Sequence, residues 1–173
     1  MFTRNWYKAL AAHFAGVGTS VKQCINVNGN MSQCASNTNG VSIKLLGTGN
    51  SPSLEKACTS LISGGYGVAF GTGTTPPTVD DIKLSGDFIT GLSCSAATSY
   101  DWQDGYVDFI GIYTLTNTTA ADITIGEVAL MCSTSQYDYP VMFERTVLDT
   151  PVTIPAGGIG VIDYSIKLPI PTA

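Results

Sequence analysis

Charge is what this sequence has least of. Asp, Glu, Lys and Arg make up only 12% of its 173 residues, roughly half the share that is usual in globular proteins. The 8 basic and 13 acidic residues give a net charge of -5, and the basic ones form no cluster along the chain. A surface that binds nucleic acid needs several Lys and Arg side chains to neutralise phosphates, so direct binding of nucleic acid is not expected.

Long hydrophobic runs and histidine are also scarce. The sequence has no apolar run of about 18 or more residues, so we expect no membrane span. Its single histidine, His13, has no neighbouring Asp, Cys or second His, and this leaves Ser/His/Asp and Cys/His catalysis without a base. The Gly-rich segment 71–77 lacks the Gly-Lys-Ser/Thr of a phosphate-binding loop. We therefore predict no enzyme and no cofactor.

Close pairs of metal-binding residues are missing as well. The chain has no C-x-x-C pair, which argues against zinc. Its cysteines are far apart, and they fit either small buried hydrophobic residues that stay reduced or a disulfide between Cys24 and Cys34. Their positions are Cys24, Cys34, Cys58, Cys94 and Cys132. Four aspartates could suggest calcium, but their spacing departs from the calcium-loop pattern and favours acidic turns. These are Asp101, Asp104, Asp108 and Asp138.

What the sequence does contain is alternation of apolar and polar residues. Segments rich in Val, Ile, Thr and aromatic residues recur through 113–168 and are separated by Asn, Asp, Gly and Pro. This pattern is typical of antiparallel strands joined by short turns, and it extends upstream through 64–71, 88–100 and 106–117. We predict a mainly β chain that folds as an antiparallel β-sandwich, jelly-roll or immunoglobulin-like, with an N-terminal helix.

Local signals add detail to this β pattern. Asp104-Gly105 predicts a tight turn before the strand at 106–117. Ile110 and Ile112 lie on the polar side of that strand's alternation, so we expect a central strand that is covered on both faces over part of its length. Gly126 interrupts a later strand and predicts a bulge that re-aims Glu127.

The first residues have helical rather than strand periodicity. Trp6, Tyr7, Leu10 and Phe14 fall on one helical face, with Thr3 as the expected cap. We consider two readings: a docking arm whose aromatic face binds a partner, or a helix that covers an open end of its own sandwich. The segment does not match a secretory signal, because Lys8 interrupts its apolar residues.

The predicted organisation therefore has three parts. Residues 1–16 form a helical arm, and residues 64–173 form the sandwich. Between them, residues 17–63 form an excursion with a hairpin at the Asn-Gly steps and a short helix near 53–62.

Glu127 and Arg145 are isolated charges in apolar strands. An unpaired buried ion is costly, so we predict that these two residues form a structural ion pair, within the chain or across a subunit boundary.

Several motifs together resemble the β-sandwich modules of tailed-bacteriophage virion proteins. They are Gly71-Thr-Gly-Thr-Thr-Pro-Pro-Thr-Val-Asp-Asp-Ile-Lys-Leu, Tyr113-Thr-Leu-Thr-Asn-Thr, Ile125-Gly-Glu-Val-Ala-Leu, Glu144-Arg-Thr-Val-Leu and Val152-Thr-Ile-Pro-Ala-Gly-Gly. The resemblance covers residues 64–168 in strand order and turn chemistry, and Ala129 stands where glycine is commoner. It implies an oligomeric, non-enzymatic virion component that is assembled in the host bacterial cytoplasm.

Within that class, an auxiliary capsid or head-decoration subunit is the leading expectation. Trp6, Tyr7, Leu10 and Phe14 would be the anchors that bind other virion proteins. The alternative inside the class is a tail, collar or tail-tip subunit. A different class is a receptor- or carbohydrate-binding module, whose aromatic platform would be made by loop residues. These are Tyr100, Trp102, Tyr137 and Tyr139.

Overall fold

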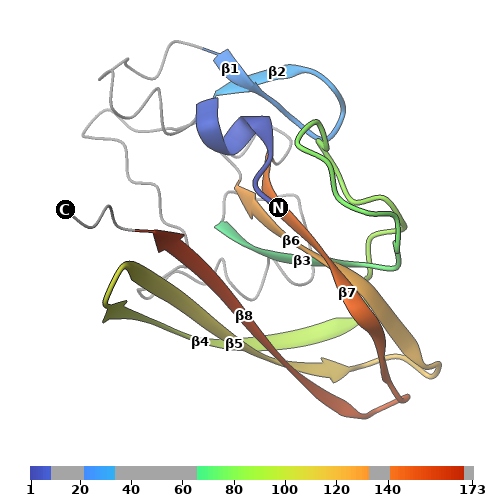
Figure 1. Ribbon diagram of the computed structural model, residues 1–173. Coiled ribbons are helices and arrows are strands. Elements are labelled where there is room, and N and C mark those ends of the chain that lie inside the picture. Colours follow the sequence, from blue (N-terminus) through green and yellow to red (C-terminus); the bar gives the residue numbers. More distant parts are fainter. Residues whose placement is uncertain (9–21, 34–65, 133–140, 170–173) are drawn as a thin grey trace.

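The protein is an antiparallel β-sandwich, as predicted (Figure 1). The computed structural model describes residues 1–8, 22–33, 66–132 and 141–169. One sheet has the order β3-β6-β7, and its strands are β3 (Tyr66–Gly71), β6 (Ile123–Cys132) and β7 (Val141–Ile154). The other has the order β4-β5-β8, with β4 (Leu92–Gln103), β5 (Tyr106–Asn117) and β8 (Ile159–Pro169).

The core lies between the two sheets. Alternate residues of each strand point inward, and the inward residues are mostly Val, Ile, Leu and aromatic side chains. Tyr113 and Leu115 of β5 are fully buried. The ring of Tyr113 meets Phe70 of β3 edge to face, with 6.3 Å between centroids, an arrangement that aromatic pairs prefer.

β5 is the central strand of its sheet. It pairs with β4 on one side and with β8 on the other, without a register shift. The tight turn at Asp104-Gly105 is present, with Gly105 at φ 82°. On the opposite face Ile112 is exposed. Ile110 on that face is half-buried, so the outer face lacks cover at Ile112, and the cover expected over part of the strand stays a prediction.

β7 is longer than its sequence pattern suggests. The segment around Pro151, which reads as a separate edge segment, continues β7 as far as Ile154. Proline is tolerated there because β7 is the last strand of its sheet. The β6–β7 register shifts between Ile125 and Glu127, so the bulge expected at Gly126 is confirmed.

A small hairpin precedes the sandwich in the chain. It pairs β1 (Lys22–Ile25) with β2 (Met31–Gln33). The side chain of Asn26 shapes its turn, because its Oδ1 accepts hydrogen bonds from the backbone N–H groups of Asn28 and Asn30. The second Asn-Gly step and the helix expected near 53–62 lie outside the described residues.

Candidate functional site

The largest polar cluster of the described residues surrounds Arg145 on β7. Arg145 and Glu127 of β6 are 1% and 0% exposed, and the structure brings them together as an ion pair within one chain. Arg145 Nε donates to Glu127 Oε2 at 2.6 Å. The bulge at Gly126 lies directly before Glu127. The two charges that stand alone in the sequence are therefore partners in space.

The two terminal nitrogens of the guanidinium bind the connection between β3 and β4, residues 72–91. Nη1 donates to Asp81 Oδ2 at 2.6 Å. Nη2 donates to the carbonyl of Thr75 and to the hydroxyl of Ser85, both at 2.6 Å. Arg145 thus holds two carboxylates and two neutral acceptors in the planar fork that suits guanidinium recognition.

Glu127 is held by the same connection from the other side. Its carboxylate accepts backbone N–H bonds from Gly73 at 3.1 Å, Ser85 at 3.1 Å and Gly86 at 2.8 Å. We call Arg145, Glu127, Asp81 and the 72–91 backbone groups that they bind the Arg145 cluster. Both of its central charges are satisfied, as a buried ion pair requires.

The electrostatics of the Arg145 cluster keep all three groups charged. Burial raises the pKa of Glu127, but the N–H of Gly86 and the guanidinium of Arg145 outweigh that effect and hold the pKa below its ordinary value. Burial also raises the pKa of Asp81, and hydrogen bonds from Thr78 and Arg145 lower it further than burial raises it. Burial lowers the pKa of Arg145, while Glu127 and Asp81 raise it overall.

Glycines let the connection lie this close to the sheet. A Cβ on Gly86 would come within 2.3 Å of the Gly73 nitrogen, and a Cβ on Gly126 would come within 2.6 Å of the Gly73 carbonyl oxygen. Each distance is far shorter than a van der Waals contact, so only a residue without a side chain fits. The Arg145 cluster therefore fixes the 72–91 connection to strands β6 and β7.

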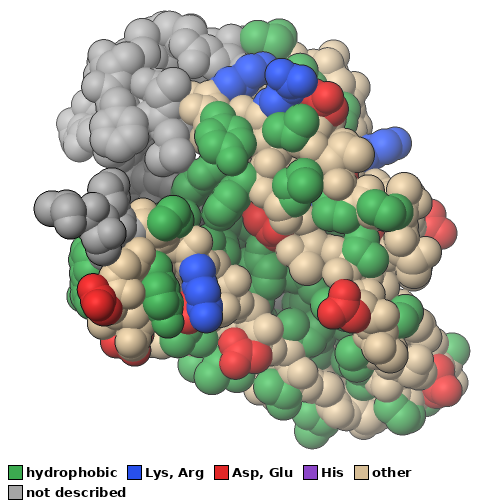
Figure 2. All heavy atoms as spheres, in the orientation of Figure 1, with side chains coloured by type: hydrophobic (Ala, Val, Ile, Leu, Met, Phe, Trp, Pro, Cys, Tyr) green, Lys and Arg blue, Asp and Glu red, His purple; other side chains and the backbone are tan. Residues whose placement is uncertain are grey.

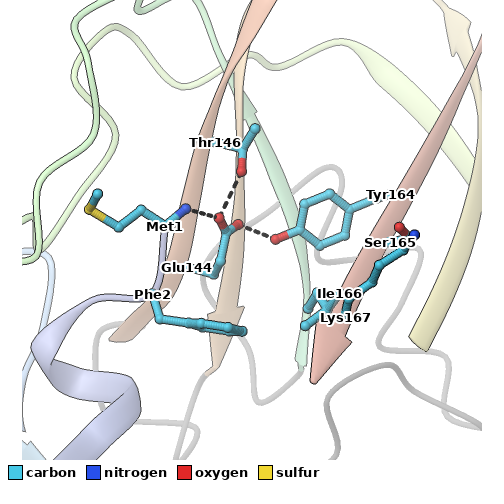
Figure 3. Close-up of a pocket in the computed structure, with 8 residues that line it drawn as sticks. All are labelled: Met1, Phe2, Glu144, Thr146, Tyr164, Ser165, Ile166 and Lys167. Atoms are coloured by element: carbon cyan, nitrogen blue, oxygen red, sulfur yellow. Dashed lines mark hydrogen bonds and ion pairs between the residues drawn. The ribbon is translucent and has the colours of Figure 1, made fainter. Parts of the chain in front are cut away.

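A second cluster lines a pocket of about 160 Å³ beside β7 and β8 (Figure 3). Glu144 is its centre. One carboxylate oxygen accepts from the Met1 amino group and from Thr146 Oγ1, and the other accepts from the hydroxyl of Tyr164. The pocket walls are completed by Phe2 and by residues 165–167. Three donors therefore hold the Glu144 carboxylate in place.

In the second cluster, the residue with the most strongly altered pKa is Tyr164. Burial raises the pKa of its hydroxyl far above the ordinary 10.0, and the adjacent Glu144 carboxylate raises it further. The hydroxyl therefore stays protonated and acts as a hydrogen-bond donor.

The residues expected to form the docking arm differ in their burial. Residues 4–8 are helical. Trp6 is only 3% exposed, because its ring stacks on Phe2 at 4.8 Å and meets Phe143 at 6.0 Å. Trp6 is thus part of the chain's own core, which agrees with the reading of a helix that covers its own sandwich. Tyr7 is 56% exposed, while Leu10 and Phe14 lie outside the described residues.

The expected cap of that helix also has a different role. The hydroxyl of Thr3 donates to the carbonyl of Met142 at 2.8 Å. The backbone N–H of Thr3 donates to the carbonyl of Phe143 at 2.9 Å. The start of the chain is therefore bound to the edge of β7 instead of standing away from the sandwich.

Large apolar side chains are exposed on the β4-β5-β8 sheet. Tyr100 and Trp102 are 64% and 67% exposed, and they lie within β4, not in a loop. Ile159 and Val161 of β8 are 68% and 63% exposed. On the face drawn in Figure 2, uncharged side chains predominate and acidic ones are scattered. Tyr137 and Tyr139, the other expected platform residues, lie outside the described part of the chain.

Cysteines and acidic residues give no metal site in the parts of the chain that the structure describes. Cys24 is buried and disulfide-bonded. The reading in which every cysteine stays reduced is therefore wrong for Cys24. Cys34, the partner considered from the sequence, is outside the described residues.

Comparison with known proteins adds no relative. No protein-family model, curated protein or solved structure matches the chain. Among the helical residues that the structure describes, none belongs to a helix of the length and apolarity needed to cross a membrane.

Proposed function

We propose that this chain is a structural subunit of a tailed-phage particle, with its place on the capsid as an auxiliary or head-decoration protein that binds other virion proteins. The observation that carries the proposal is the open outer face of the β4-β5-β8 sheet. Ile159, Val161 and Ile112 are all exposed there. Exposed apolar side chains grouped on one face are typical of protein–protein interaction sites.

The chemistry of this face suits another protein surface. The register places Ser93, Thr116 and Ile159 in one row and Ser95, Thr114 and Val161 in the next. Both rows carry hydroxyl and aliphatic groups and no charge. These two rows can be buried against a partner without the desolvation of ions, whereas the next row places Asp163 beside Ile112.

The buried ionic groups support a structural role. Arg145, Glu127 and Glu144 each form several hydrogen bonds within the chain. These contacts fix loops and strands to one another and create a rigid surface. The proposal therefore assigns no catalytic step and no cofactor. It includes self-association of the chain, and it involves neither nucleic acid nor membrane.

The test is to find the protein on particles of the phage whose genome encodes it. Immunogold electron microscopy of those particles, with antibody against the purified chain, should place label on the heads. Val161→Lys should reduce labelling, because a charge would be buried at the contact. Asn28→Lys, on the exposed β1–β2 turn, is the matched control and should label like the wild type. Unlabelled particles would overturn the proposal.

A tail, collar or tail-tip subunit is the alternative within the same class. The same open face would then bind neighbouring subunits of a ring around the tail axis instead of the capsid lattice. Label confined to tails in the same experiment would select this alternative.

A receptor- or carbohydrate-binding module is the alternative from another class. It is favoured by Tyr100 and Trp102, whose rings are exposed on one face of β4. Aromatic rings on a flat surface can stack on sugars. A glycan array with the wild type and Trp102→Ala should give signals that the substitution removes. An array without signals would reject this alternative.

A further inference from the structure

The four outer edges of the two sheets are covered unequally. At β7, residues 1–3 lie along the strand, and Thr3 N donates to Phe143 O at 2.9 Å. At β3, the end of the connection covers the edge, and Ile89 N donates to Phe70 O at 2.9 Å. Covering an edge in this way prevents pairing with other chains.

The edge strands β8 and β4 differ in the residues that oppose pairing with another strand. β8 carries Asp163, Lys167 and Pro169, and charges and proline both oppose the addition of a strand. β4 is twelve residues long, contains no proline, and has Asp101 as its sole charge. Its pairing with β5 is regular, without a bulge. Among the described strands, β4 is the long edge without protection (Figure 1).

The core-facing side of β4 is also incompletely covered. Leu92 and Cys94 are buried on this side, but Ala96, Tyr100 and Trp102 follow on the same side and are exposed. The residue of β5 opposite Trp102 is buried. Val107 of β5, directly opposite Trp102, is 8% exposed. Added side chains beside β4 would therefore cover both an open backbone edge and an exposed aromatic pair.

We propose that β4 pairs antiparallel with β4 of a second copy, so that the two sheets join across a twofold axis. This inference goes beyond the virion role, because it concerns the pairing of the chain with itself and holds whether the particle site is head or tail. Twofold pairing uses the same surface on both copies and closes on itself, so it gives a dimer and not a fibre.

The sequence of β4 selects a register for this pairing. With Thr98 opposite Thr98 of the second copy, Tyr100 lies opposite Ala96 and Trp102 lies opposite Cys94. Large side chains then fall beside small ones, as packed cross-strand pairs require. The same register places each Asp101 opposite Ser95, so the two like charges stay far apart. The strand is thus self-complementary in size and in charge.

Light scattering on size-exclusion fractions tests the pairing. The wild-type chain should elute as a dimer that dissociates on dilution. Ala96→Lys places a charge beside Tyr100 of the second copy and should raise the dissociation constant by at least about tenfold. Val161→Lys, at an exposed site on the opposite edge strand, is the control and should remain dimeric. Circular dichroism of both variants should match the wild type, because both sites are exposed.

Oxidative cross-linking tests the register. Thr98→Cys should give a covalent dimer under oxidation, because the two copies of this position face each other at the axis. Gln103→Cys, which would face Ser93, should give none. Three results would overturn the proposal. The first is a wild-type chain that stays monomeric at every concentration, and the second is a dimer whose dissociation constant Ala96→Lys does not change. The third is cross-linking at position 103 and not at position 98.

The outcomes separate this inference from the virion role. Loss of dimer with retained particle labelling in Ala96→Lys supports β4 pairing and leaves the virion role standing. If Val161→Lys remains dimeric but no longer labels particles, the outer face of the β4-β5-β8 sheet is the surface that binds the particle. A dimer that forms with no label on any particle supports the pairing and rejects the virion role.

Discussion

Arg145 and Glu127 are joined by a 2.6 Å hydrogen bond between Nε and Oε2, although neither side chain is accessible to water. The pair does more than neutralise itself. The guanidinium extends to Asp81 and the carboxylate to the backbone of Gly86, so strands β6 and β7 bind both halves of the 72–91 connection. That connection also supplies the residues that cover the edge of β3. By holding the connection in place, the Arg145–Glu127 pair keeps this edge covered.

Replacing Arg145 with Met should destabilise the fold strongly. The substitution preserves much of the side-chain volume but leaves Glu127 as an uncompensated buried charge, and breaking a buried pair in this way typically costs about 3–5 kcal/mol. Urea unfolding at pH 7 measures the loss. Arg4→Met is the matched control, because Arg4 pairs with Asp80 at an exposed site and exposed pairs contribute little. Equal midpoints for Arg145→Met and the wild type would contradict the locking role.

The Glu127–Arg145 pair was predictable because each charge stands alone in an apolar strand. Its partners Asp81 and Ser85 were not, because they lie in an irregular connection, 64 and 60 residues from Arg145 in the chain. Such a segment has no periodicity to align it with a sheet. The nearest signal is Thr78, whose hydroxyl and N–H both donate to Asp81, a spacing that marks a local turn but not its tertiary contact.

Periodicity predicts a buried face without saying what covers it. For β5 it gave the correct inner face, but it did not distinguish the outer Ile110, which is half-buried, from Ile112, which is exposed. For Trp6 it left open whether the ring meets a partner or the same chain, and the ring packs on Phe143 of the same chain. In each case the missing information was three-dimensional proximity, which a single sequence does not encode locally.

Acid should weaken the fold through the Arg145 cluster. The pKa values of Glu127 and Asp81 lie below the ordinary 4.5 and 3.8 in the folded chain. The unfolded chain therefore binds more protons in this range, and the stabilisation is present above about pH 4.5 and lost as pH falls through the folded values. Unfolding free energies from urea at pH 7 and pH 3 measure the drop. Asp81→Asn should be less stable than the wild type at pH 7 and should show a smaller drop. An equal drop in both proteins would contradict the assignment.

Gly86→Ala should disturb the same cluster sterically. The added methyl group would meet backbone atoms of Gly73, which cannot rotate away as a side chain would, so a loss of about 3 kcal/mol, the upper end for overpacking, is expected. Gly157→Ala is the comparison: nothing lies within 4 Å of its Cβ, but φ is +69°, so only the backbone cost of roughly 1–2 kcal/mol applies. Hydrogen exchange of residues 72–91 should accelerate in Gly86→Ala alone. Unchanged exchange there would argue against the close approach.

Tyr164→Phe should change stability at alkaline pH. In the wild type the pKa of Tyr164 is raised well above 10.0 in the folded chain, so above about pH 10 only the unfolded chain ionises this residue. The unfolded state then binds fewer protons, and stability falls as pH rises. Phenylalanine removes this component. It also removes a hydrogen bond to Glu144, which costs about 1.5–3 kcal/mol at neutral pH. At pH 9 the wild type should exceed Tyr164→Phe in unfolding free energy, and this difference should become smaller at pH 11. A difference that stays constant would contradict the raised pKa of the buried hydroxyl.

Trp6→Ala and Tyr7→Ala compare two adjacent aromatic residues of the N-terminal segment with opposite surroundings. Trp6 is enclosed by Phe2 and Phe143, and truncating a buried tryptophan costs about 3–5 kcal/mol. Tyr7 is exposed, and such a surface change usually stays within about 0.5 kcal/mol. Thermal unfolding of the two variants should therefore give a large loss for Trp6→Ala and almost none for Tyr7→Ala. Full stability of Trp6→Ala would contradict the contribution of this ring to the core.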